Sequence, residues 1–473
     1  MSLRAEPGPR LALLSLGCDK NTVDSERLLA SLVARGAVHT RDPSDADVVV
    51  VNTCGFIDAA KQESIEMLLE IGRLKREGRC RTLVAMGCLV ERHRDELSPE
   101  LPEVDVFVGL RDIDRLFPEL EARGWLGGPR EAHPGDRLPL SNRRHVRYLK
   151  VSEGCDHGCA FCAIPLWRGR HRSFPLEGVV AEAQQLEFQG AVEVNLVAQD
   201  LAHYGREGRN GADLTGLLRQ LLAETTIPWF RLLYIYSAGI RDPLVDLIAT
   251  EPRIVPYLDM PIQHASDSVL ERMRRPERRG RLREKVRWLR SAIPDLTLRT
   301  TVLVGFPGET DEDFRSLLDF LEETAFDRLG AFAFSPQEGT RAAAMDEDVV
   351  PPGLAQDRLE ELLEVQRAIS AERLAREVGR RREVLVERLV PRPFGRTRGQ
   401  ADDVDGVTAL VSATPLSPGA LVEVDITGAA DFDLEGRVVR ELRRPPRSIS
   451  EPYAPRRRAL PVVSLGLESG WGR

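Results

Sequence analysis

The chain has 473 residues and a net charge of −8 at pH 7, with 30% charged and 42% hydrophobic residues. This composition is ordinary for a soluble globular protein of about three domains, and the net negative charge excludes a protein that holds nucleic acid through its overall electrostatic field. Because no stretch approaches the ~18 consecutive apolar residues of a membrane helix and the opening MSLRAEPGPR is no secretory signal, we expect a cytoplasmic protein without a membrane partner.

The first segment, which we place at residues 10–125, alternates short apolar runs with helical stretches. Strands are predicted within residues 11–18, 45–56, 81–88 and 104–109, and helices within 25–36 and 60–75. The strands are apolar along their whole length, which is typical of strands buried on both faces. This alternation predicts an α/β fold with a doubly wound parallel sheet.

Three cysteines of this segment occupy equivalent positions. Cys18, Cys54 and Cys88 each stand at or just past the C-terminal end of a predicted strand, beside a glycine. That edge of an open α/β sheet is where ligands bind, so the pattern favours a metal site with three thiolate ligands. Three unrelated buried cysteines are the alternative. Cys80 comes before a strand, at the opposite end, and we expect it to be structural.

The second segment, residues 141–375, follows a linker rich in Gly and Pro (Gly124–Ser141). Six strands are predicted within residues 147–154, 192–200, 229–236, 254–262, 296–307 and 328–336, and helices such as 176–190 and 311–325 separate most of them. Six strand–helix units are too few for a complete eight-stranded barrel. We therefore expect a partial, open (β/α)6 barrel.

The third segment begins after a charged helix predicted at residues 353–379. Short β runs within residues 383–390, 406–413, 420–429 and 434–442, separated by Gly and Pro turns, predict a small all-β barrel at residues 380–446. The remaining residues, 447–473, are rich in Pro and Arg, and we expect them to be disordered.

A compact group of three cysteines follows the first strand of the second segment. Cys155, Cys159 and Cys162 have the spacing C-x3-C-x2-C within EGCDHGCAFCAIP. Structural zinc normally takes four tight ligands, and the one local addition, His157, lies inside the loop that the cysteines must wrap. A 4Fe-4S cluster on three thiolates leaves one iron open, unlike a ferredoxin cluster with four cysteines. Iron–sulfur binding is favoured, and zinc is the alternative.

This spacing, with the aromatic Phe161 before the last cysteine, resembles the radical S-adenosylmethionine (SAM) enzymes. The resemblance implies that the amine and carboxylate of SAM chelate the open iron. It also implies that the reduced cluster cleaves SAM to methionine and a 5′-deoxyadenosyl radical. Phe161 would then lie against the adenine.

Further cofactor contacts are predicted less directly. Residues 301–314, TVLVGFPGETDEDF, look like the family's fifth-strand segment near the nucleoside. Gln199 and Gly305 are predicted to bind the cofactor because they stand at strand ends. His203 and His264 are as compatible with packing or surface roles as with catalysis.

The order of the three segments, over roughly residues 10–445, resembles the radical SAM methylthiotransferases. LGCDKNTVDSE, VNTCGF and MGCL are similar to that family's three N-terminal cysteine segments. The resemblance implies that Cys18, Cys54 and Cys88 hold a second 4Fe-4S cluster that delivers sulfur to an unactivated C–H position. It further implies a TRAM domain in the terminal barrel, a second SAM as methyl donor, a sulfur donor and an electron donor such as flavodoxin or ferredoxin. We expect a monomer.

Two branches of this family differ in substrate. The RimO-type branch modifies the β-carbon of an aspartate in small-subunit ribosomal protein twelve, and the MiaB-type branch modifies a tRNA adenosine. Residues 383–441 contain eleven acidic and six basic residues, a net charge of −5 that suits a basic protein better than a phosphate backbone. Residues 257–273 and 196–205 also resemble the ribosomal-protein branch, which we favour. The alternative is that the acidic surface at residues 383–441 is solvated and binds no partner. In either branch, we expect the two cysteine-bearing sheet edges to face each other.

Overall fold

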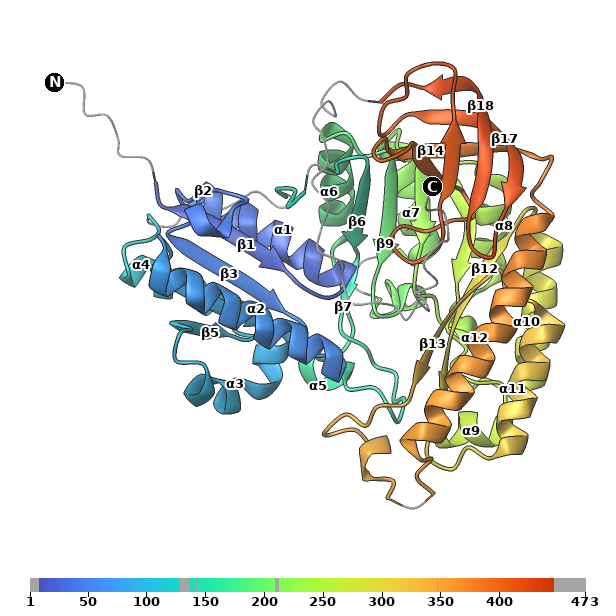
Figure 1. Ribbon diagram of the computed structural model, residues 1–473, viewed down its shortest axis with the longest axis horizontal. Coiled ribbons are helices and arrows are strands. Elements are labelled where there is room, and N and C mark those ends of the chain that lie inside the picture. The colour runs from blue at the N-terminus through green and yellow to red at the C-terminus, as the bar shows by residue number, and fades with distance from the viewer. Residues whose placement is uncertain (1–7, 128–135, 142, 209–211, 347, 446–473) are drawn as a thin grey trace.

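The computed structural model describes residues 8–127, 136–141, 143–208, 212–346 and 348–445. The tail predicted at residues 447–473 and the middle of the predicted linker lie outside these described residues. The described chain forms two parallel sheets and a closed β-barrel, each with helices or loops around it (Figure 1).

The first unit is a five-stranded sheet in the order β2-β1-β3-β4-β5, and every neighbouring pair is parallel. Its strands are β1 (Arg10–Ser15), β2 (Val38–His39), β3 (Val48–Thr53), β4 (Thr82–Gly87) and β5 (Val106–Val108). Its helices are α1 (Asp19–Ala34), α2 (Asp58–Glu77), α3 (Cys88–Glu100) and α4 (Leu116–Ala122), with the short 3-10 helices η1 (Pro43–Asp45) and η2 (Ile113–Arg115).

The predicted doubly wound sheet is confirmed by its two separate hydrophobic cores. Side chains of α1 and α4 pack on one face of the sheet and side chains of α2 and α3 on the other. Strands β3 and β4 are buried along their whole length, which explains why their sequences are apolar without alternation. The prediction missed the two-residue β2 and the helix α3, which begins at Cys88 itself.

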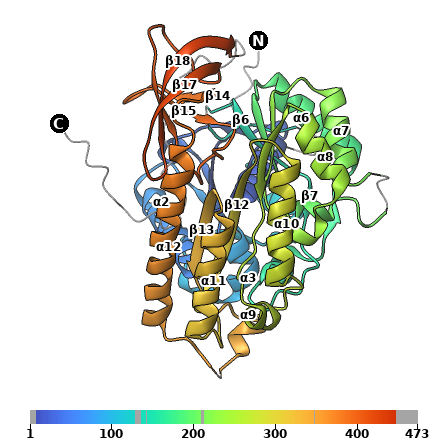
Figure 2. The same cartoon turned by 90° about the vertical axis from the view of Figure 1, so that its right-hand side faces the viewer.

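The second unit is a six-stranded parallel sheet in the order β13-β12-β11-β10-β9-β6, with no pairing between its two outer strands. Its strands are β6 (Val146–Lys150), β9 (Glu193–Val197), β10 (Trp229–Leu232), β11 (Ile254–Asp259), β12 (Thr297–Val304) and β13 (Arg328–Ala333). Helices cover its outer face; α10, α11 and α12 lie side by side in Figure 2. The predicted partial (β/α)6 barrel is therefore confirmed.

The remaining elements of this unit connect its strands. The helices are α5 (Ile164–Arg168), α6 (Leu176–Phe188), α7 (Leu214–Glu224), α8 (Asp242–Thr250), α9 (Asp267–Arg272), α10 (Arg279–Ala292), α11 (Asp311–Thr324) and α12 (Pro352–Ala375). Shorter elements are the antiparallel pair of β7 (Ser152–Glu153) and β8 (Arg172–Ser173) and the 3-10 helices η3 (Leu201–His203), η4 (Ser237–Gly239) and η5 (Ala342–Ala344).

The third unit is a closed barrel in the order β14-β15-β16-β18-β17. Its strands are β14 (Arg381–Arg388), β15 (Phe394–Thr397), β16 (Thr408–Val411), β17 (Leu421–Ala429) and β18 (Leu434–Arg443). The prediction of a small all-β barrel is confirmed, although β15, a short strand that contains a glycine, was missed.

This barrel docks on the beginnings of the central strands. The indole of Trp229, the first residue of β10, donates a hydrogen bond to Glu383 at 2.5 Å. The guanidinium of Arg396 in β15 lies 2.5 Å from Glu193, the first residue of β9. A buried apolar cluster that includes Val146 and Leu385 fills the space between the two units. The C-terminal ends of the central strands therefore lie on the side of the central sheet that is opposite the barrel.

The first unit is joined to the central one by buried ion pairs. Arg137 lies in the described part of the predicted linker, is 1% exposed, and contacts Glu26 of α1 and Glu182 of α6. Arg147 of β6 contacts the same Glu26 carboxylate at 2.8 Å. This part of the linker is thus packed into the structure. Among the described residues, no helix is long and apolar enough to cross a membrane.

Candidate functional site

The structure brings together the three cysteines of the first unit. Cys18 caps the start of α1, Cys54 follows β3 and Cys88 opens α3, so all three stand at one edge of the sheet. The backbones here approach so closely that a Cβ on Gly17 would come within 2.7 Å of the Cys54 sulfur. Burial, together with the charges of Cys18 and Cys88, raises the pKa of Cys54 to about 12.

A buried asparagine connects two of the turns at this edge of the sheet through hydrogen bonds. The Asn21 side chain donates hydrogen bonds to the carbonyl oxygens of Leu16, at 3.0 Å, and Thr53, at 3.2 Å. Gly87, immediately before Cys88, has a φ of 106°, and a Cβ there would lie 2.4 Å from the Thr53 carbonyl oxygen. Glycine is therefore required where β4 turns into α3. These contacts hold the three cysteine-bearing turns in place.

The second group of cysteines lies on the loop between β7 and α5. Its backbone is fixed by hydrogen bonds from the Cys155 amide to Gly169 O at 3.1 Å and from the Ala160 amide to Met273 O at 2.9 Å. Burial, together with the charges of the neighbouring cysteines of the group, raises the pKa of Cys155 to about 11 and that of Cys162 to about 12.

Both donor sets fit an iron–sulfur cluster. All seven cysteines of the chain are free thiols, so neither group is consumed by a disulfide. A thiolate that is costly to form in a buried site becomes favourable when it binds a cation, and sulfur ligands select soft metals such as iron in clusters. Three thiolates leave one coordination position of a four-iron cluster open. Such a position can bind a small molecule directly.

The two groups face each other, as the sequence predicts. The loop after β10 lies between them: the Lys20 ammonium, two residues after Cys18, sits 3.3 Å from the centre of the Tyr234 ring. Two residues further on, the Tyr236 ring stacks at 4.0 Å on His157, which belongs to the second cysteine loop. In Figure 1 the arrowheads of β1 and β3 point toward β7 and α5. The two sheet edges thus border one region.

Arg168, the last residue of α5, contacts residues at both cysteine-bearing edges. It is 8% exposed, and its Nη2 lies 3.5 Å from the sulfur of Cys88 and 2.5 Å from Asn21 Oδ1. Its Nη1 donates to Asp24 of α1 at 3.2 Å and to Glu153, two residues before Cys155, at 3.1 Å. One guanidinium therefore touches both cysteine-bearing edges.

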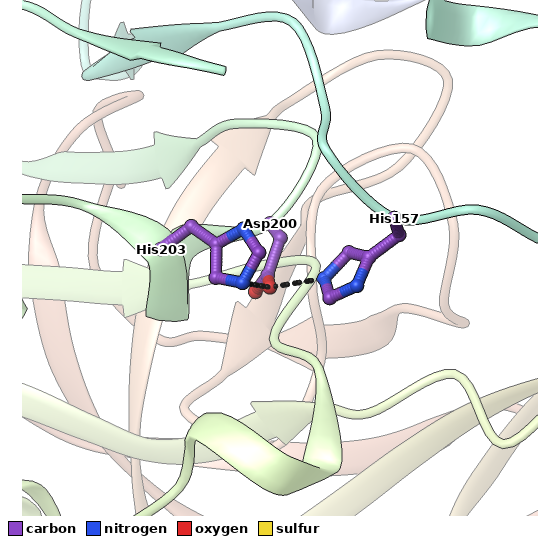
Figure 3. Close-up of side chains that lie close together, drawn as sticks. All are labelled: His157, Asp200 and His203. Atoms are coloured by element: carbon purple, nitrogen blue, oxygen red, sulfur yellow. Dashed lines mark hydrogen bonds and ion pairs between the residues drawn. The ribbon is translucent and has the colours of Figure 1, made fainter. Parts of the chain in front are cut away.

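A cluster of two histidines and one aspartate joins the second cysteine loop to the segment after β9 (Figure 3). Asp200 accepts a hydrogen bond from His157 Nε2 at 2.8 Å and lies 3.7 Å from His203 Nε2. The two imidazole rings stack at 4.3 Å. Asp200 also accepts backbone hydrogen bonds from Ala202 and Tyr236, so its carboxylate is well satisfied. These residues could hold a metal ion, but as they stand they tie η3 and the cysteine loop together.

Neither Asp200 nor Arg168 is among the site residues predicted from the sequence. Asp200 could have been found from its position, since it is a carboxylate three residues past the end of β9, on the edge that carries the ligand sites. Arg168 has no such signal, because its role depends on the docking of two units.

The predicted cofactor residues differ in their surroundings. Gln199 donates to Glu153 at 3.2 Å, and its carbonyl oxygen is buried without a protein partner, which leaves an acceptor for a ligand. Phe161 packs against an apolar cluster that includes Met273 and Phe306.

Gly305 is less suited to contact a cofactor. Its amide donates to Glu309 at 2.8 Å, and a Cβ on it would meet Ala355 of α12 at 2.4 Å. His264 is fully buried, and its Nδ1 accepts a hydrogen bond from the Ser266 amide, which is a packing role. Cys80, 3% exposed, lies 3.6 Å from the Thr82 carbonyl oxygen at the start of β4, away from both groups.

Three sequence families match consecutive parts of the chain. Residues 10–109 match the family described as uncharacterized protein family UPF0004, residues 149–321 the radical SAM superfamily, and residues 378–439 the TRAM domain. The three matches correspond in order to the two sheets and the barrel.

Curated relatives match almost the whole chain. The ribosomal protein uS12 methylthiotransferase RimO of Anaeromyxobacter sp. (strain Fw109-5) is 46% identical over 96% of this chain and 99% of its own. The enzymes of the same name from Geobacter sulfurreducens and Myxococcus xanthus are 42% and 43% identical, each over 91% of this chain and over 98% and 91% of their own. Among solved structures, the radical S-adenosylmethionine methyltransferase TsrM from Kitasatospora setae aligns with a TM-score of 0.48 at 14% identity over 69% of this chain and 72% of its own, too weakly to carry an argument.

Proposed function

The chain belongs to the family of ribosomal protein uS12 methylthiotransferases. We propose below which of its residues perform each part of the reaction. It is a radical SAM enzyme whose cofactors are SAM and 4Fe-4S clusters. The ribosomal-protein reading is supported over the tRNA alternative, because relatives that match nearly the entire chain carry the uS12 name. We propose the β-carbon of an aspartate in uS12 as the position that receives the methylthio group.

We propose that Cys155, Cys159 and Cys162 hold the cluster that binds SAM. When bound, this cluster and SAM supply the radical that removes a hydrogen atom from the substrate. The observation that carries the proposal is the confinement of the three thiols to one tight loop at the C-terminal edge of the central sheet. Gln199, with its unpartnered carbonyl oxygen, and Phe161 are the residues we propose to orient SAM; Gly305 is the weaker candidate, since its amide is already occupied.

We propose that Cys18, Cys54 and Cys88 hold the auxiliary cluster that supplies sulfur, while a second SAM supplies the methyl group. The facing of the two sheet edges supports this division, because sulfur must reach a carbon that the other site has activated.

The remaining parts of the proposal concern partners. We propose a cytoplasmic monomer that receives electrons from a protein such as flavodoxin or ferredoxin and that is resupplied by a sulfur donor. The acidic barrel at residues 383–441, with a net charge of −5, suits a basic ribosomal protein.

The proposal is tested by expressing the chain in a bacterial strain that lacks both the uS12 and the tRNA methylthio modifications. Intact-mass and peptide mass spectrometry of uS12, and nucleoside analysis of tRNA, are then carried out on the same cells. We expect a methylthio group on an aspartate of uS12 and none on tRNA adenosine. Modified tRNA with unmodified uS12 would overturn the substrate assignment.

A further inference from the structure

Each cysteine group has one buried arginine beside it. Arg168 is 8% exposed, and its Nη2 lies 3.5 Å from the sulfur of Cys88. Arg275 is 5% exposed, and its Nη1 lies 3.9 Å from the sulfur of Cys159. A buried guanidinium stays charged at any physiological pH, so each site contains a permanent positive charge within contact of a ligand sulfur.

Both arginines are held in place by other groups, so neither can swing away. Arg168 is fixed by Asn21, Asp24 and Glu153.

Arg275 is fixed differently. Its Nη2 donates to the Pro261 carbonyl oxygen at 2.6 Å and to Glu277 at 3.3 Å, and its guanidinium lies 4.1 Å from the centre of the Tyr236 ring. Glu277 is itself held by Tyr236 and Ser237. This second guanidinium is thus tied to the same loop that separates the two cysteine groups.

We propose that these two arginines set the reduction potentials of the two clusters separately, Arg168 at Cys18, Cys54 and Cys88, and Arg275 at Cys155, Cys159 and Cys162. The inference rests on the cluster assignment made above and goes beyond it, since it assigns positioning residues to each site. Both act through the ligand sulfurs and not on the substrate.

The sign of the effect follows from charge. A cluster gains one negative charge on reduction, so a nearby cation or a hydrogen bond to a ligand sulfur stabilises the reduced form and raises the potential. Removing the Arg168 charge should lower the potential of the auxiliary cluster. Removing the Asp24 charge, 3.2 Å from Arg168 on the same side, should raise it. A merely structural disturbance would not reverse its sign between these two variants.

The experiment uses two full-length parent chains, each with one group of cysteines replaced. C155A/C159A/C162A retains only the auxiliary group, and C18A/C54A/C88A retains only the SAM-binding group. Both are loaded anaerobically with iron and sulfide, analysed for both elements, and titrated against potential while electron paramagnetic resonance follows the reduced cluster.

In the auxiliary-only parent, we expect R168Q to lower the ratio of reduced to oxidised cluster at least tenfold at a fixed potential, a shift of 59 mV for one electron. R168K keeps the positive charge and should shift the reduction potential by less than half as much as R168Q. D24N should raise the ratio of reduced to oxidised cluster, and R275Q should leave this ratio unchanged. In the other parent, R275Q should lower the ratio and R168Q should not.

Each other outcome is decisive. If R168Q retains its cluster without a shift, or shifts both clusters equally, the inference is wrong. If R168Q takes up no iron, the reduction potentials of R168K and D24N test the inference in its place. Shifts of the same sign in these two variants would overturn the inference. If neither parent chain binds iron and sulfide, the cluster assignment itself has failed, which is a separate result.

Discussion

Asp200 Oδ2 lies 2.8 Å from His157 Nε2, and this pair joins the loop after β9 to the loop that carries three cysteines. The same carboxylate accepts a hydrogen bond from the Tyr236 amide at 3.1 Å, and the Tyr236 ring stacks on the His157 ring at 4.0 Å. His157 stands midway between Cys155 and Cys159, so its position limits how the loop can bend. Asp200 is therefore one of the residues through which the central unit shapes the cysteine loop.

Replacing Asp200 by Ala should loosen this loop. Residues that orient metal ligands typically change metal affinity or activity 10–100-fold when removed, and we expect a loss of this order in iron retention at Cys155, Cys159 and Cys162. Iron per chain in the C18A/C54A/C88A parent, and 5′-deoxyadenosine formed from SAM by the complete enzyme, measure it. Asp213→Ala is the matched control, because Asp213 also caps a helix, through the Gly216 amide at 2.9 Å, but touches no cysteine loop. Equal losses in both variants would contradict the prediction.

The two cysteine groups should fail in different ways. Replacing Cys155, Cys159 or Cys162 by Ala should abolish cleavage of SAM, since the cofactor would have no cluster to bind. Replacing the other group, Cys18, Cys54 and Cys88, should leave SAM cleavage in place and stop the transfer of sulfur to uS12. Chromatography of 5′-deoxyadenosine and mass spectrometry of uS12 on the same reaction separate the two effects. Modified uS12 from the second set of variants would refute the auxiliary-cluster assignment.

The junction between the first two units should weaken in acid. Burial on its own would raise the pKa of Glu26, but Arg147 and Arg137 lower it to about 2, below its ordinary value of 4.5. A carboxyl whose pKa is lowered by folding contributes stability above its unfolded pKa and loses it as pH falls. The free energy of unfolding should therefore decrease between about pH 4.5 and pH 2 partly through this residue, as urea titrations at several pH values can measure.

Glu26→Gln tests the same junction at neutral pH. The substitution leaves Arg137 and Arg147 buried without a full counter-charge, and breaking such a pair costs about 3 kcal/mol of unfolding free energy. The pH dependence between 4.5 and 2 should be correspondingly flatter. Glu100→Gln on the exposed end of α3 is the control and should stay within about 0.5 kcal/mol of the parent chain. A variant of Glu26 as stable as this control would show that the junction carries little stability.

Cys80 should be dispensable for chemistry. It is buried at the start of β4, the end of the strand opposite Cys88. Cys80→Ala removes one buried sulfur, so we expect a cost of about 1 kcal/mol in urea unfolding and unchanged iron content and activity. A loss of iron comparable with that of Cys88→Ala would place Cys80 among the ligands.

The sequence predicted most of the fold because its strands are short, apolar and bounded by clear turns. The positions of Cys18, Cys54 and Cys88 could be inferred because each directly follows a strand, and parallel strands end at one edge. Short or glycine-containing strands such as β2 and β15 carry too few apolar residues to form a pattern.

The supporting side chains could not be predicted in the same way. Arg168 and Cys88 are 80 residues apart and meet only because the first unit packs against the central one. The stacking of Tyr236 on His157 likewise joins two loops that no periodicity relates. Contacts of this kind depend on tertiary packing, which a local pattern does not encode.

The barrel at the C-terminal end of the described chain stands on the beginnings of the central strands, whereas the cysteines stand at their far ends. The eight residues of β12 rise about 26 Å, at ~3.3 Å each, between these two levels. A substrate that touches the barrel while it offers a carbon to the cysteines must reach across that height. A peptide much shorter than eight residues could react at the cysteines but could not contact the barrel at the same time. Binding by the barrel would therefore discriminate between a whole protein and its fragments.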